Sequence, residues 1–113
     1  MWAGMEGYML EGDLARIFQL PQERGVLVQR IAKGSPAAKI GLQAGDRKAR
    51  IGSEEFLVGG DVILEVHGIS FADTDARARL GELLESLPPG TPLSIFVLRG
   101  GRKLELQWTP PKR

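Results

Sequence analysis

The sequence predicts one mixed α/β domain that is rich in β structure. Its 113 residues, 42% hydrophobic and 26% charged, have the composition of an ordinary globular protein with one modest core. Several short runs of apolar and β-branched residues, separated by glycines, are typical of strands. Residues 75–87 instead repeat their apolar side chains at helical spacing and end at two prolines.

The first half of the chain alternates extended and helical segments. Residues 5–10 form a short extended run, and residues 13–20 have the spacing of a short amphipathic helix that we expect Asp13 to cap. Residues 25–31 are apolar or β-branched at nearly every position, which indicates a buried strand. The stretch GSPAAKIGL at 34–42 combines glycines, a capping serine and a proline suited to the first helical position. It predicts a turn and one helical turn.

Two Gly-Asp pairs, at 45–46 and 60–61, look like one junction that occurs twice. Between them, Gly52-Ser53 separates two extended arms, which predicts an inserted β-hairpin at residues 46–60. A small cluster of charges on a hairpin is usually solvated, although it is also compatible with an acidic partner. The basic residues of this hairpin are Arg47, Lys48 and Arg50.

The second half continues with a strand at 61–66, which ends in a turn at His67, a residue type that tolerates left-handed backbone. Residues 73–74 (Asp-Thr) are expected to cap the helix at 75–87. The chain closes with a hairpin over 93–108 around a Gly-Gly turn, and its last strand has one solvent-exposed face.

Composition argues against several functional classes. The net charge of +1 argues against a nucleic-acid binder, and the absence of cysteine rules out disulfides and thiolate metal sites. His67 is the only histidine, and no nucleophile motif surrounds any serine, so we expect no catalytic residues, no metal and no cofactor. No apolar run approaches a membrane span. The amino terminus lacks a signal-peptide pattern, which favours a domain excised from a longer protein.

The segments GSPAAKIGL (34–42) and GGDVILEVHG (59–68) together resemble the PDZ family in its bacterial form, as found in HtrA/Deg-like serine proteases. The resemblance implies a PDZ domain at 1–109 and a loose tail at 110–113. It also implies a partly open antiparallel β-sandwich of five or six strands with one long and one short helix, plus the inserted hairpin.

In function, the resemblance implies a module that recognises apolar C-terminal or extended peptide segments. Its partners would be C-terminal or unfolded polypeptides and the protease domain of a parent chain, in the bacterial periplasm or cell envelope. One alternative is a structural or assembly domain whose groove packs on a partner domain or subunit. Another is a PDZ domain of a different envelope protease or secretion component.

The implied site is a strand edge at residues 5–10, preceded by a carboxylate-binding loop whose order is aromatic, apolar, glycine, apolar. A peptide would add to this edge as an antiparallel strand, and successive backbone N–H groups would hold its carboxylate. The open alternative is a glycine-rich terminus with no ligand. The residues expected to contact the peptide are Trp2, Ala3, Gly4, Met5, Glu6, Gly7, Tyr8, Arg77, Leu80, Gly81 and Leu84.

Helical spacing sets Arg77, Gly81 and Leu84 along one line of the long helix. By resemblance, Leu84 floors the pocket for the last side chain, and Gly81 leaves space. Arg77 then lies near the third residue from the end and predicts an acidic or an undiscriminating preference there. Leu80 is equally expected as an ordinary core residue, and Arg77 as a solvated helix residue.

Overall fold

The computed structural model describes residues 4–88 and 90–109, so Trp2, Ala3 and the predicted tail at 110–113 lie outside the described residues. In chain order the elements are β1 (Met5–Glu11), α1 (Asp13–Ile17), β2 (Arg24–Ile31), α2 (Pro36–Ile40), β3 (Arg47–Ile51), β4 (Glu54–Val58), β5 (Val62–Val66), β6 (Ile69–Ser70), α3 (Ala76–Ser86), β7 (Leu93–Arg99) and β8 (Arg102–Trp108). None of the helices described is long and apolar enough to cross a membrane.

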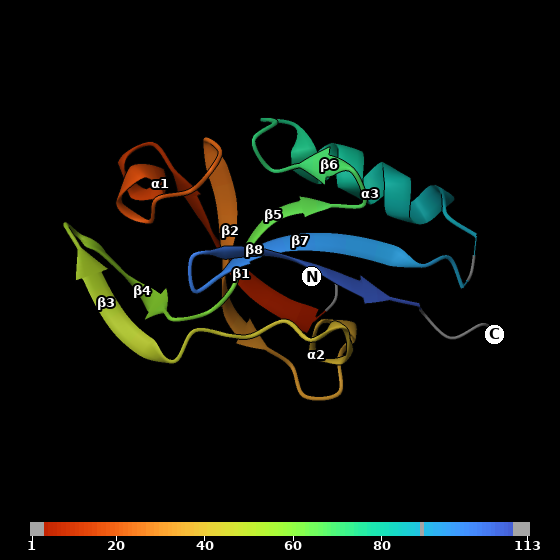
Figure 1. Ribbon diagram of the computed structural model, residues 1–113, viewed down its shortest axis with the longest axis horizontal. Helices are drawn as coiled ribbons and strands as arrows, with labels where there is room; N and C mark the ends of the chain where they lie inside the picture. Colours follow the sequence, from red (N-terminus) through yellow and green to blue (C-terminus); the bar gives the residue numbers. More distant parts are fainter. Residues whose placement is uncertain (1–3, 89, 110–113) are drawn as a thin grey trace.

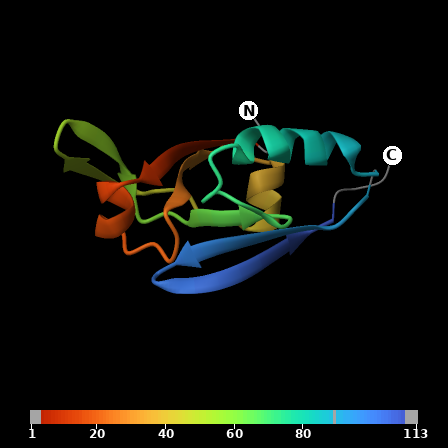
Figure 2. The ribbon, with the colours of Figure 1, turned by 90° about the horizontal axis from the view of Figure 1, so that it is seen from above.

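The main sheet is antiparallel, with strand order β1-β2-β5-β7-β8 and the short β6 beside β5. Among the described strands, β3 and β4 pair only with each other, and Figure 1 shows this hairpin projecting from the body. Figure 2 shows α3 and the β7–β8 pair on opposite sides of β5. The predicted fold class, a β-rich open antiparallel architecture with an inserted hairpin, is confirmed.

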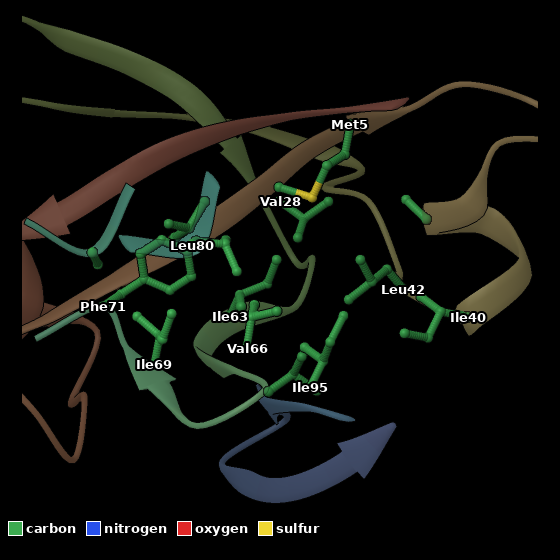
Figure 3. Packing of buried hydrophobic residues seen from close by; sticks show 14 residues of the cluster. Met5, Val28, Ile40, Leu42, Ile63, Val66, Ile69, Phe71, Leu80 and Ile95 are labelled. Atoms are coloured by element: carbon green, nitrogen blue, oxygen red, sulfur yellow. The ribbon is translucent and has the colours of Figure 1, made fainter. Parts of the chain in front are cut away.

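The core consists of two clusters of buried side chains. In the first, Leu80 and Phe71 from one side and Leu42 from the other converge on the centre of the sheet (Figure 3). The second gathers the opposite face of β1 and β2 with the hairpin, through Leu10, Leu27 and Phe56 among others. The first cluster holds α3 against the sheet, and the second holds the hairpin. Burial of each side chain of this size contributes about 1.5–3 kcal/mol to the stability of the fold.

The stretch at 34–42 folds as the sequence predicts. The Ser35 hydroxyl accepts a hydrogen bond from the Ala38 N–H at 3.3 Å, and Pro36 occupies the first helical position. Gly41 ends α2 in the left-handed region, with φ of 97°. His67 also has positive φ, 48°, which confirms its prediction as a turn residue.

Two predicted helix caps are wrong. Gly12 holds the N-cap position of α1, and the Asp13 carboxylate instead pairs with Arg16 one turn later. Helix α3 begins at Ala76, and the Asp73 side chain pairs with Arg79. In both cases an arginine within reach competes with the backbone N–H groups for the carboxylate.

A buried carboxylate joins three elements. Asp61 is 0% exposed, and its two oxygens accept hydrogen bonds from Arg99 Nε at 2.7 Å and Nη2 at 2.8 Å. The same carboxylate accepts the Gln43 N–H at 2.9 Å, and Arg99 Nη2 also donates to the Gly41 carbonyl at 2.9 Å. This pairing raises the pKa of Arg99 above its ordinary value. The end of α2, the start of β5 and the end of β7 therefore meet at one charge pair.

The hairpin leaves and re-enters the body at one point. A Cβ on Gly60 would lie 2.6 Å from the Gly45 nitrogen, so the two Gly-Asp junctions are in contact. Above them the Gln29 side-chain amide acts as a strand partner for Leu57: it accepts the Leu57 N–H at 2.8 Å and donates to its carbonyl at 2.9 Å. The insertion is thus closed at its base and tied to β2.

Replacement of Arg99 by alanine is expected to lower the free energy of unfolding by about 3–5 kcal/mol, because it leaves the Asp61 carboxylate buried without its counter-ion. The control is Arg102→Ala on the exposed start of β8, which should change it by about 0.5 kcal/mol or less. Urea denaturation followed by circular dichroism measures both. Equal effects of the two variants would show that the ion pair is not a structural link.

Candidate functional site

A groove of about 640 Å³ lies between the edge strand β1 and helix α3. Its floor is apolar and its charged residues lie on the helix side. The lining residues are Met5, Gly7, Val26, Phe71, Arg77, Leu80, Gly81, Leu84 and Glu85. A hollow of similar volume, 660 Å³, lies beside α1, but its lining is mostly charged and polar. The β1–α3 groove is the better binding site because an apolar floor there runs along a strand edge.

Strand β1 is one of the two edge strands of the main sheet and pairs with β2 alone among the described strands. A bulge between Glu6 and Gly7 shifts its register. Gly7 is required by close packing, since a Cβ there would lie 2.3 Å from Val26 Cγ1. The other edge of β1 therefore keeps backbone groups beside the groove, where an extended chain can pair with them.

Helix α3 supplies the opposite wall. Leu80 is 8% exposed and belongs to both the core and the groove, so its two predicted roles coincide. No atom lies within 4 Å of the place where a Gly81 Cβ would be, which leaves space in the groove. Arg77 is exposed and forms no salt bridge with the described residues. Its guanidinium is therefore available to a ligand at the rim.

The structure brings together six of the predicted contact residues: Met5, Gly7, Arg77, Leu80, Gly81 and Leu84. Sequence reasoning missed Val26, Phe71 and Glu85, which also line the groove. Helical spacing could have predicted Glu85 as a groove residue, because it follows Gly81 by four residues and so lies on the same face of the helix. Val26 and Phe71 read only as apolar positions, and no local signal distinguishes them from other core residues.

Three predicted residues, Gly4, Glu6 and Tyr8, do not line the groove. Gly4, with φ of 73°, packs against Ser35, the N-cap of α2, and its carbonyl accepts the Ala32 N–H at 2.7 Å just after β2. Glu6 pairs with Arg30 at 3.1 Å. Their backbone still belongs to the β1 edge and its approach, so only main-chain contacts remain open to Gly4 and Glu6.

Tyr8 faces the hairpin. Its ring stacks on Phe56 with 4.9 Å between the centroids. Burial first, and then the neighbouring Glu54 carboxylate, raise the pKa of Tyr8 above its ordinary value. The Tyr8 side chain therefore packs behind β1 and not in the groove. Among the described residues, no group of three or more histidine, aspartate or glutamate side chains is placed to hold a metal ion.

The two glycines of the groove predict opposite effects on stability. Gly81→Ala should raise the free energy of unfolding by about 0.5–1 kcal/mol, because alanine favours a helix interior and its methyl group meets open space. Gly7→Ala should lower it by about 1–3 kcal/mol, because its methyl group collides with Val26. Thermal and urea unfolding test the pair. A stabilising Gly7→Ala would contradict the close approach of β1 and β2.

A family model described as PDZ domain matches residues 12–109. Two curated relatives are the periplasmic pH-dependent serine endoprotease DegQ of Escherichia coli (strain K12) and a probable periplasmic serine endoprotease DegP-like of Hahella chejuensis. DegQ is 28% identical over 106 residues, which cover 94% of this chain and 19% of that protein. The DegP-like protein is 31% identical over 105 residues, which cover 93% and 19%. This chain therefore spans about a fifth of the length of these relatives.

Solved structures of HtrA-type protease AlgW are also similar. The structure with a decapeptide has a TM-score of 0.57 and 28% identity, and the match covers 99% of this chain and 30% of that one. The structure with a tripeptide has a TM-score of 0.56 and 28% identity, with 99% and 32% covered. These matches confirm the resemblance found in the sequence.

Proposed function

Because the chain belongs to the PDZ domain family, we propose that its β1–α3 groove binds apolar C-terminal or extended segments of polypeptides by strand addition. One observation carries the proposal: the edge strand β1 runs beside an apolar groove that faces α3. Main-chain hydrogen bonds to β1 supply affinity without sequence preference, and the groove supplies selectivity through alternate side chains of the ligand.

In the proposed complex the ligand runs antiparallel to β1. Its last side chain enters the apolar space between Met5 and Leu84, beside the gap left by Gly81. Its terminal carboxylate accepts hydrogen bonds from the backbone N–H groups of Gly4 and Met5 and, in the predicted loop, from that of Ala3. The positive φ of Gly4 supports this assignment, since consecutive N–H groups converge in such a conformation.

The affinity of such a site is modest. Burial of one apolar side chain contributes about 1.5–3 kcal/mol and each main-chain hydrogen bond about 1 kcal/mol. Ordering of the peptide and loss of its translational freedom offset much of this. We expect a dissociation constant of roughly micromolar order, near −8 kcal/mol. Weak, reversible capture suits recruitment or sensing.

We further propose that the domain recruits substrates to, or regulates, a serine protease domain in a longer HtrA/Deg-like protein of the bacterial periplasm. The curated relatives are named as periplasmic serine endoproteases, and the solved AlgW structures contain a decapeptide or a tripeptide. This chain would supply the peptide site, and the rest of that protein the catalytic residues.

The first test is an amide-resolved NMR titration with two forms of one short apolar peptide, one with a free carboxyl end and one amidated. We expect the free acid alone to bind, with shifts at Gly4, Met5, Gly81 and Leu84, because only a carboxylate needs the N–H groups of the loop. Equal binding of both forms would mean that internal segments add to β1 without the loop. Absence of binding by either form would contradict the proposal and favour an assembly role for the groove.

A second test concerns Arg77. A peptide with aspartate at the third residue from its end should bind about two- to fivefold more tightly than one with lysine there, as expected for an exposed ion pair worth up to about 1 kcal/mol. In the Arg77→Glu variant the order of the two peptides should reverse. Isothermal titration calorimetry measures the four constants, with Arg79→Glu outside the groove as the matched control. An unchanged order would leave Arg77 a solvated helix residue.

A further inference from the structure

The groove continues past the site for the last residues of the ligand. A second hollow of about 410 Å³ adjoins it and shares two of its lining residues, Phe71 and Arg77. It extends toward the far end of β1 and the start of α3, where Met9 and Ala78 line it. The two hollows therefore form one track along β1.

The length of β1 matches this track. The strand has seven residues from Met5 to Glu11, which at about 3.3 Å per residue span about 20 Å between its ends. In the proposed antiparallel pairing, the last ligand residue lies by Met5 and the third by Gly7. Since side chains on one face of a strand alternate, the fifth residue from the end lies by Met9. Met9 belongs to the second hollow only.

The second hollow has an apolar floor and a rim that carries charges of both signs. Met9 is half-buried, and Phe71 is buried beneath it. On the rim, Glu11 pairs with Arg24 at 3.1 Å, and Asp73 pairs with Arg79. Asp75 and Arg77 also lie on this rim and form no salt bridge with the described residues. A ligand charge of either sign would therefore meet a like charge as well as an opposite one, whereas an apolar side chain covers the exposed part of Met9.

We propose that this hollow is a second specificity subsite, which takes an apolar side chain at about the fifth residue from the ligand's carboxyl end. The inference rests on the proposed function, since it uses the same strand addition. The ligand is then a carboxyl-terminal segment of at least five ordered residues. It has apolar side chains at its last and fifth positions and, from the exposed Arg77, a preference for an acidic residue at the third.

The test uses this chain and three ten-residue peptides with free carboxyl ends and the same last four residues. They carry leucine, glycine or aspartate at the fifth position from the end. By isothermal titration calorimetry we expect the leucine peptide to bind about fivefold more tightly than the other two. A three-residue peptide with the same ending gives the contribution of the terminal pocket alone.

A variant tests whether the preference for leucine arises in the second hollow. Ala78→Arg fills the second hollow from the exposed face of α3 and should abolish the preference for leucine. The matched control Ser86→Arg adds the same side chain to the same helix, in a separate hollow beside His67, and should keep the fivefold ratio. Circular dichroism melting of both variants checks that the fold is intact.

Equal affinities of the leucine, glycine and aspartate peptides would overturn the second subsite and leave the proposed function standing. A leucine preference that survives Ala78→Arg would also overturn it, because the preference would then arise elsewhere. If no free-acid peptide binds, the proposed function itself fails.

Discussion

The Asp61–Arg99 pair is the interaction on which the geometry of the molecule depends. A carboxylate that is fully buried costs several kcal/mol in lost hydration unless each of its oxygens has a donor. Here Arg99 and the Gln43 N–H supply those donors, and Arg99 also binds the carbonyl of Gly41. The end of α2, the start of β5 and the end of β7 are therefore held together at this pair. The site lies on strands positioned by this arrangement, since β2 joins β5 to β1.

The inserted hairpin follows from the same junction. Because Gly45 and Gly60 touch, residues between them can be added without moving β2 or β5. The hairpin nevertheless contributes to the site from behind. Phe56 stacks on Tyr8, whose neighbours Gly7 and Met9 belong to the groove face of β1. An edge strand with one free side gains rigidity from packing on its rear face, and a rigid edge loses less entropy when a ligand strand adds.

Much of the fold could be predicted from the sequence because its signals are local. Apolar runs, glycine turns and the helical stripe of α3 each depend on a few adjacent residues, and the groove positions of Gly81 and Leu84 follow from helical spacing plus the family resemblance. The pairs Asp61–Arg99 and Gln29–Leu57 span 38 and 28 residues, and no local pattern specifies such partners. The caps assigned to Asp13 and Asp73 failed for a different reason. Their arginine partners lie only three and six residues away, but the sequence does not show whether such a carboxylate binds the arginine or the backbone N–H groups.

The groove is lined by two kinds of residue: buried residues that also belong to the core, and exposed residues on α3. Met5, Val26 and Leu80 are buried in the first core cluster and also floor the groove, so a change that reshapes the floor also costs packing energy in the core. Arg77, Ala78 and Glu85 stand exposed on α3 and contribute little to the core. Affinity for an apolar ligand end is therefore tied to the stability of the fold, whereas preference along the ligand can vary through rim residues at almost no structural cost. A binding module with such a division can acquire new peptide preferences and keep the same scaffold.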